Sequence, residues 1–300
     1  MTLILNGAKI DCTVAPGVVL YSVYECDSAW ETRESYGAAV DTGAAQKKAR
    51  KTDGAFYSYV SMNVTGGAEG SGVLNITSTF EGLDTELHLT VNGGSLHILA
   101  GLGSEGDGID SNGYVVINGG TVVALGASMD WAESDGSENA GQAAVNLSFS
   151  QRQSADEAIV ITDTDGKVVF AYDPDKDEVA ESNARWYSGA ILSAPGLTVG
   201  REYYIYVGGD VEGEEVAGVY DPDSVTGFTA DAKQQCWTGT GTLGGFGGGP
   251  GGFGGGGGGF DPSGGNGGFD PNGGDATGEG EVVFSLSEKV NGFTGVRDAE

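Results

Sequence analysis

The stretch Glu81-Gly82-Leu83-Asp84 is repeated 26 residues later as Asp107-Gly108-Ile109-Asp110. At the same offset and without a gap, Leu89-Thr90-Val91-Asn92-Gly93-Gly94 aligns with Val115-Val116-Ile117-Asn118-Gly119-Gly120. A looser copy covers residues 53–76. Self-similarity at such a period is typical of stacked units, each of which buries its apolar side against its neighbours.

Each repeat has the pattern strand, Asn-Gly-Gly turn, strand, with apolar residues at alternating positions and no helical period. Like strands at this spacing predict successive coils of a parallel β-helix, in which equivalent residues lie about 4.8 Å apart. We therefore expect Val91 to stack on Ile117, and Asn92 to stack on Asn118 in an amide ladder. Positive φ angles are expected at the corner glycines Gly93, Gly94, Gly119 and Gly120. An ordinary Asn-Gly hairpin is the alternative that local sequence leaves open.

Composition divides the chain into four parts. Residues 1–141 form the repeat domain, which begins with a further strand and turn, Leu3-Ile4-Leu5-Asn6-Gly7. Residues 142–238 lose the period and show antiparallel signals, which predict a small β-sandwich-like module that caps the coils. Residues 239–280 hold 23 of the 56 glycines and are expected to be a flexible linker. Residues 281–300 regain a strand pattern and are expected to return and pair with the folded body. The predicted fold class is therefore all-β.

The balance of charge excludes several kinds of partner. Fourteen Lys and Arg residues stand against 43 Asp and Glu residues, giving a formal net charge of -29. Such a field repels polyanions, so we expect no binding to nucleic acid or to an anionic membrane. No apolar run is long enough to predict a membrane span, and Met1 leads straight into a strand-like segment, so no signal peptide is predicted. The three cysteines fit no metal-binding spacing, and a Cys12–Cys26 pair is left open.

Acidic residues point to a metal. Residues 52–151 contain 12 acidic residues and no Lys or Arg. Stacking of the repeats places Glu81 level with Asp107, and Asp84 level with Asp110. Carboxylates about 5 Å apart repel by roughly 1 to 3 kcal/mol at a surface-like dielectric unless a cation neutralises them, and Ca²⁺ accepts carboxylate, carbonyl and amide oxygens. The candidate calcium ligands are Glu81, Asp84, Glu86, Asp107, Asp110 and Asn112. The alternative is a solvated acidic edge whose charges are merely screened.

Aromatic residues are the second functional signal. Sugar-binding surfaces combine aromatic rings with hydrogen-bonding groups, because pyranose C–H groups pack on ring faces while the hydroxyls need polar partners. The candidate carbohydrate-binding residues in or beside the repeats are Tyr57, Tyr59, Tyr114 and Trp131. For each of them, packing in the core is the alternative. His88 and His97 alternate with the apolar residues of their strands and are expected to be surface histidines.

Several strings also resemble those of a known family. They are Glu81–Leu89, Gly106–Gly113, Ile117–Thr121, Trp186–Ala190 and Tyr206–Gly209. Together they resemble the secreted bacterial carbohydrate-binding domain-containing proteins, over most of residues 1–237. The resemblance implies a right-handed, pectate-lyase-like β-helix that binds calcium and plant-type polysaccharides such as cellulose or polygalacturonate, without established catalysis. It also implies an extracellular or cell-surface location.

Three functions are consistent with these features. The first is non-catalytic binding of an extracellular polysaccharide, with calcium as a stabilising ion. The second is a structural role, in which the open ends of a short β-helix self-associate into filaments. The third is a polysaccharide lyase on the same scaffold. A lyase needs a base beside the uronate to abstract its proton. The resemblance to pectate-lyase-like proteins implies that this base would be an Arg or Lys above the calcium. Because residues 52–151 offer neither, we do not expect an enzyme.

Overall fold

A computed structural model describes residues 18–20, 54–67, 71–78, 80–100, 106–127, 129–133, 141–155, 157–173, 186–237 and 282–299. Within these ranges the ordered elements are strands, which confirms the predicted all-β class. None of the described segments is a helix with the length and apolar character needed to cross a bilayer. The fragment at residues 3–7, Cys12, Cys26 and the glycine-rich residues 239–280 lie outside the described residues.

The strands of the repeat region are β1 (Val18–Leu20), β2 (Phe56–Ser58), β3 (Met62–Val64), β4 (Val73–Thr77), β5 (Leu83–Thr85), β6 (Leu89–Val91), β7 (Ser95–Leu99), β8 (Ile109–Ser111), β9 (Val115–Ile117) and β10 (Thr121–Gly126). Those of the second half are β11 (Gln142–Ser154), β12 (Ile159–Asp163), β13 (Val168–Tyr172), β14 (Trp186–Thr198), β15 (Arg201–Val207), β16 (Val211–Glu212), β17 (Glu215–Val216), β18 (Val219–Tyr220), β19 (Gly227–Phe228), β20 (Ala232–Trp237), β21 (Phe284–Leu286) and β22 (Val290–Asp298).

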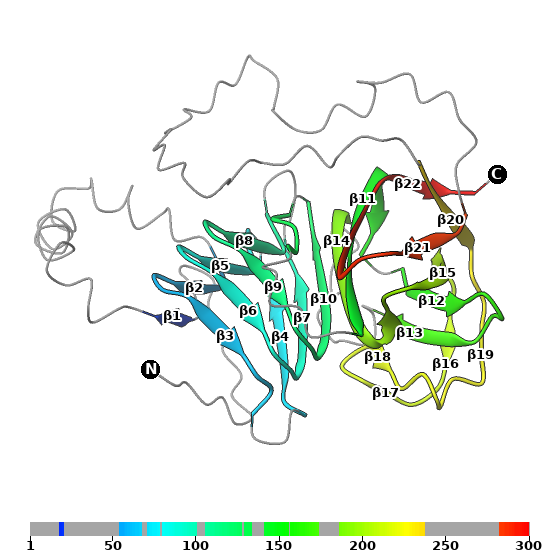
Figure 1. The fold of residues 1–300 in the computed structure, drawn as a ribbon, viewed down its shortest axis with the longest axis horizontal. Coiled ribbons are helices and arrows are strands. Elements are labelled where there is room, and N and C mark those ends of the chain that lie inside the picture. Colours follow the sequence, from blue (N-terminus) through cyan, green and yellow to red (C-terminus); the bar gives the residue numbers. More distant parts are fainter. Residues whose placement is uncertain are drawn as a thin grey trace, which may run out of the picture.

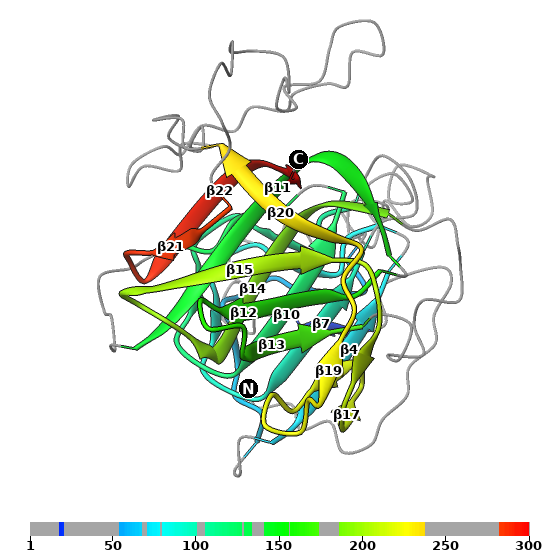
Figure 2. The ribbon, with the colours of Figure 1, turned by 90° about the vertical axis from the view of Figure 1, so that its right-hand side faces the viewer.

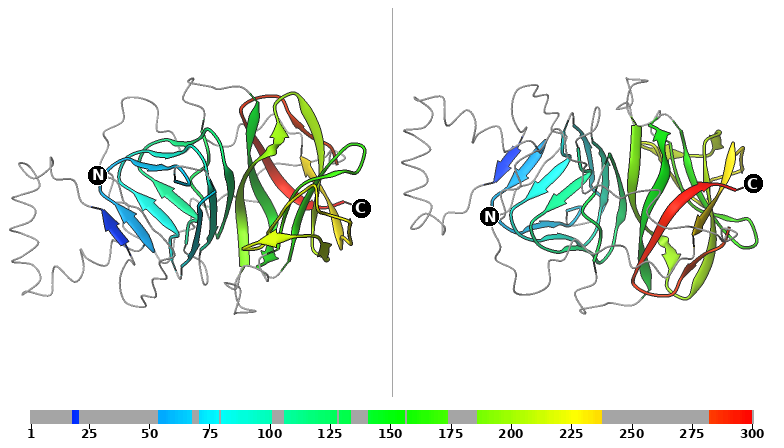
Figure 3. Two further views of the ribbon diagram at one scale, coloured as in Figure 1. Left: turned by 90° about the horizontal axis from the view of Figure 1, so that it is seen from below. Right: turned by 90° about the horizontal axis from the view of Figure 1, so that it is seen from above.

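The repeats pair with one another in three parallel ladders, visible side by side in Figures 1 and 3. The first ladder is β1-β2-β5-β8, the second is β3-β6-β9, and the third runs through β4, β7 and β10. Val91 pairs with Ile117 in register, and the Asn118 side-chain amide donates to the Asn92 amide oxygen at 3.1 Å. The predicted stacking and amide ladder are therefore confirmed. The alternative of an Asn-Gly hairpin is wrong, because the strands that flank each turn pair with the next repeat and not with each other.

Each repeat contributes one strand to each ladder, and we call such a repeat a coil. Alternating apolar residues of the coils point into one shared core. Leu83, Leu89, Leu96, Ile109 and Ile117 each expose between 0% and 2% of their surface, and they belong to the same hydrophobic cluster. Burying apolar side chains of this size stabilises the fold by about 1.5 to 3 kcal/mol each. The repeat in the sequence thus becomes a repeated layer of the core.

The two glycines at each corner have different roles. Gly94 and Gly120 have φ angles of 83° and 84°, as predicted. Gly93 and Gly119 do not have positive φ angles, so that part of the prediction is wrong. Instead, a Cβ at Gly93 would lie 3.0 Å from the Thr65 carbonyl oxygen of the coil below. At the first glycine of each pair consecutive corners approach closely. At the second, the chain turns with a positive φ angle, which glycine adopts readily.

One sheet joins the repeat region to the second half. Its strand order is β17-β18-β13-β12-β15-β20-β22-β11-β14-β10-β7-β4, and β10 pairs with β14 in antiparallel fashion. The C-terminal strands return to the folded body, as predicted: β21 pairs with β15, and β22 lies between β20 and β11. Figure 2 shows β12, β13 and β15 as a layer in front of β11, β14 and β10. A second hydrophobic cluster fills the space between these layers.

The second layer changes the environment of His97. This residue points away from the core of the coils, as expected, but only 1% of its surface is exposed. Its ring centroid lies 5.8 Å from that of Tyr172 on β13. The prediction of a surface histidine is wrong, because strands far along the chain cover the outer face of β7.

Burial of His97 makes stability depend on pH. Burial lowers the pKa of His97 to about 4, while a hydrogen bond with the Ala217 backbone works in the opposite direction. The unfolded chain then binds a proton at His97 more readily than the folded chain. The stability that the neutral, buried His97 contributes is therefore fully present above pH 6.5 and is lost as the pH falls toward 4. Comparing wild type with His97→Gln by calorimetry, we expect the stability difference to shift by about 3 kcal/mol against wild type between pH 7 and pH 4. A difference that is constant with pH would contradict this.

Candidate functional site

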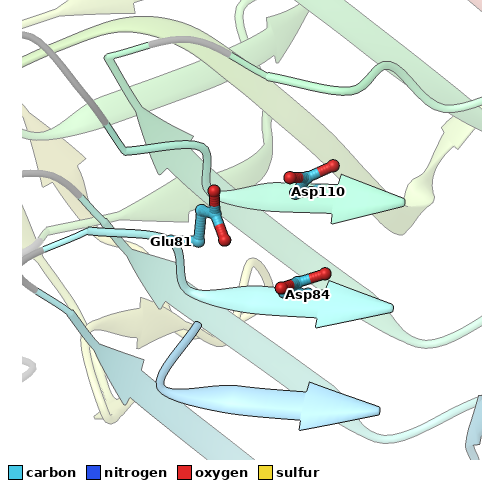
Figure 4. A group of neighbouring side chains, drawn as sticks. All are labelled: Glu81, Asp84 and Asp110. Atoms are coloured by element: carbon cyan, nitrogen blue, oxygen red, sulfur yellow. The ribbon is translucent and has the colours of Figure 1, made fainter. Parts of the chain in front are cut away.

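Three acidic side chains meet on the first ladder (Figure 4). Glu81 precedes β5, Asp84 lies on β5, and Asp110 lies on β8. One carboxylate oxygen from each lies within 4.8 Å of the others. Asp84 and Asp110 pair in register because the repeat stacks equivalent positions. Asp84 is buried, whereas Glu81 and Asp110 are half-buried.

Ionising Asp110 in this group is unfavourable. The pKa of Asp110 is raised to about 7, first by burial and then by the charges of Asp130 and Asp107 and a hydrogen bond with Asp130. A hydrogen bond with Glu81 acts in the opposite direction. A carboxyl group with this pKa gains from any nearby cation, because the cation removes the repulsion that favours its protonated form.

Asp130 is the acidic residue that the sequence did not reveal. Its backbone N–H donates to the Ile109 carbonyl at 3.0 Å, and its side chain accepts from the Ser111 N–H at 2.8 Å. It therefore lies one level beyond Asp110, although it follows Asp110 by 20 residues and not by 26. Because the shortened coil breaks the period, alignment of the repeats cannot find it. Burial and the charge of Asp130 also raise the pKa of Glu133.

Among the other predicted calcium ligands, the acidic residues Glu86 and Asp107 lie outside the group within 4.8 Å. Asp107 acts on Asp110 through its charge. Glu86 and Asn112 form a polar ladder on the exposed side, in which the Asn112 amide donates to Glu86 Oε2 at 2.8 Å. The Tyr57 hydroxyl donates to the other oxygen of Glu86. Among the predicted ligands, the structure thus brings Glu81, Asp84 and Asp110 together and gives Glu86 and Asn112 partners of their own.

The four aromatic candidates differ in their surroundings. Tyr57 is buried and packs edge-on against half-buried Tyr59, with ring centroids 4.8 Å apart. Its hydroxyl is hydrogen-bonded to Glu86. Half-buried Tyr114 stacks on His88, which is exposed. Trp131 packs against the core of the coils. Half-buried Tyr59 and Tyr114 are therefore more accessible to a sugar than buried Tyr57, and Trp131 is half-buried as well.

The acidic group offers three oxygen donors at a spacing that a divalent cation could bridge. Oxygens bound to one Ca²⁺ lie about 2.3 to 2.6 Å from the ion, so two of them can be at most about 5 Å apart. The carboxylate oxygens of Glu81, Asp84 and Asp110 lie within 4.8 Å of one another and so could contact one ion. All three donors are carboxylate oxygens, the ligands that Ca²⁺ prefers.

Comparison with known protein families gives a match over more than half of the chain. Residues 1–173 match the family model of the carbohydrate-binding domain-containing protein. The chain belongs to this family. The family named from the sequence is therefore confirmed. Neither a curated protein nor a solved structure matches the chain.

The family match covers the three ladders and every candidate site residue, and it ends with β13. The strings Trp186–Ala190 and Tyr206–Gly209 lie beyond it. In this member of the carbohydrate-binding family, Ala190 on β14 pairs with Leu125 of the last coil. The later strands thus support the matched region by extending its sheet.

Proposed function

We propose that this member of the carbohydrate-binding family binds an extracellular polysaccharide, of the cellulose or polygalacturonate type, without cleaving it. The observation that carries the proposal is the family match, which covers the three-residue corner that joins the first ladder to the second in successive repeats. At that corner the Glu86–Asn112 pair and the stacked rings of His88 and Tyr114 lie together at the surface. Rings and exposed polar groups side by side are what a pyranose requires. We further propose that the three ladders form a short, right-handed, pectate-lyase-like parallel β-helix.

Calcium is the ion that we propose for the acidic group. Glu81, Asp84 and Asp110 would hold it, and the charges of Asp107 and Asp130 would add to the attraction. When bound, the ion neutralises the carboxylates and links the coil of β5 to the coil of β8. Support comes from the spacing of the donors and from the raised pKa of Asp110.

The two alternative functions are a polysaccharide lyase and a structural protein that self-associates. A lyase would need a base near its substrate, and residues 52–151 carry no Lys or Arg. Self-association is favoured by the position of β3 and β4 as end strands of their sheets within the described residues, since strand edges can pair with another copy.

The experiment is a binding panel of cellulose, polygalacturonate, xylan and mannan, with the full chain in Ca²⁺, in Mg²⁺ and in EDTA. We expect retention by cellulose or polygalacturonate in Ca²⁺, and a loss of affinity of about tenfold, or 1.4 kcal/mol, on chelation. Ultraviolet absorbance of the supernatant is expected to show no unsaturated sugar product.

Each contrary result has a distinct meaning. Unsaturated product would overturn the non-catalytic proposal, and equal binding in EDTA would overturn the role of calcium. No retention by any of the four polysaccharides would overturn the function itself. Size-exclusion chromatography of the same samples would show polymers if self-association were the function.

A further inference from the structure

In each coil, a short corner of three residues joins the first ladder to the second. Ser61, His88 and Tyr114 are the last residues of three successive corners, because the strands that follow them, β3, β6 and β9, pair in register. These three side chains therefore occupy one position, repeated up the stack.

Two of these side chains form a regular stack of rings. The His88 and Tyr114 centroids are 5.2 Å apart and their planes differ by 10°, close to the spacing of about 4.8 Å between coils. The Tyr114 backbone N–H donates to His88 Nδ1 at 2.8 Å, which fixes the imidazole. A Cβ at Gly113 would lie 2.4 Å from that nitrogen, so the glycine leaves room for the ring.

The third position of the stack carries no ring. Ser61 is exposed and has only a short side chain, whose Oγ accepts from the His88 backbone N–H at 3.5 Å. Within the described residues, Tyr114 is the one ring that contacts His88. The imidazole face turned toward the level of Ser61 thus has a hydroxyl beside it where a ring would continue the stack. The exposed Glu86–Asn112 pair lies on the same corners.

We propose that this face of His88 is a subsite for one pyranose residue, which takes the third place in the stack. The sugar C–H groups would pack on the imidazole, and the sugar hydroxyls would bond to the Ser61 hydroxyl and to Glu86. The inference rests on the proposed polysaccharide-binding function and identifies a residue that contacts the sugar. His88 acts here through its ring face, whereas its Nδ1 is occupied by Tyr114.

Two substitutions separate the ring from the hydrogen bond. His88→Phe keeps a flat ring and loses the acceptor for the Tyr114 N–H, and His88→Gln keeps an acceptor and loses the ring. The probes are cellopentaose and pentagalacturonate, titrated by calorimetry into the full chain in Ca²⁺. With the probe that wild type binds, we expect His88→Gln to bind about tenfold more weakly and His88→Phe to stay within about threefold of wild type. Thermal unfolding of each variant checks that the coils remain folded.

The outcomes distinguish this inference from the function on which it rests. If wild type binds a probe and His88→Gln binds equally well, the subsite is overturned and the function stands. If His88→Phe loses binding while His88→Gln keeps it, His88 acts by holding Tyr114, and the subsite is again overturned. If wild type binds neither pentasaccharide and none of the polysaccharides, the function and the subsite both fail.

Discussion

Replacing Asp110 with asparagine is expected to raise the midpoint of thermal unfolding at pH 8 in EDTA and to lower it in millimolar Ca²⁺. The pKa of Asp110 is raised to about 7. An acid with a raised pKa holds its proton more tightly when folded, so its destabilising effect grows as the pH rises from about 4 to 7 and is complete above 7. Asparagine has the same shape without the charge, and it removes this cost.

The size of the expected stabilisation follows from the raised pKa of Asp110. One pKa unit corresponds to about 1.4 kcal/mol, and solvent screens part of the shift because Asp110 is half-buried. We expect a gain of about 2 kcal/mol in EDTA, or roughly 4 to 8 °C, which disappears at pH 4. In Ca²⁺ the order reverses, because the variant lacks one ligand and forgoes the roughly 2.7 kcal/mol that a hundredfold excess over Kd supplies.

The matched control is Glu212→Gln, which removes one exposed acid from β16. It is expected to leave the midpoint within about 1 °C in either buffer. If Asp110→Asn has the higher midpoint in both buffers, Asp110 does not bind calcium. If it has the lower midpoint in EDTA at pH 8, the ionised carboxylate carries no cost and the electrostatic account is wrong.

The second large effect is expected from Gly120→Ala, which we predict to prevent the last coil from packing. Gly120 has a φ of 84°, and a Cβ there would lie 2.5 Å from the Gly94 carbonyl oxygen. The variant therefore suffers backbone strain and also a clash with the corner of the coil below. Relief requires the coils to separate, so we expect a loss of more than about 4 kcal/mol, seen as a fall in soluble yield and in the denaturation midpoint.

Gly166→Ala is the control that separates the effect of the clash between corners from the effect of backbone strain. Gly166 has nearly the same φ, 86°, and a Cβ there would meet nothing within 4 Å. Its cost is the left-handed conformation alone, about 1 to 2 kcal/mol. Equal losses for the two variants would show that contact between corners contributes nothing beyond the φ angle.

Much of the candidate site could be predicted from the sequence, because residues one repeat apart lie next to each other in stacked repeats. Once Glu81-Gly82-Leu83-Asp84 recurs after 26 residues, parallel stacking places Asp84 beside Asp110 whatever the rest of the chain does. The amide ladder of Asn92 and Asn118 follows for the same reason. Alternation of apolar residues likewise determined which side chains fill the core.

What lies outside the period depended on tertiary structure. Asp130 lies beside Asp110 because the coil between them is shortened. The 26-residue spacing of the repeats therefore does not align these two residues. The stack of His88 on Tyr114 arises because Gly113 leaves room for the imidazole, a steric condition that neither residue shows alone. His97 is buried because Tyr172 lies on a strand that folds back over β7. A repeat fixes the neighbours of a residue within its own coils, whereas the layer that covers those coils is decided by contacts between segments with no sequence in common.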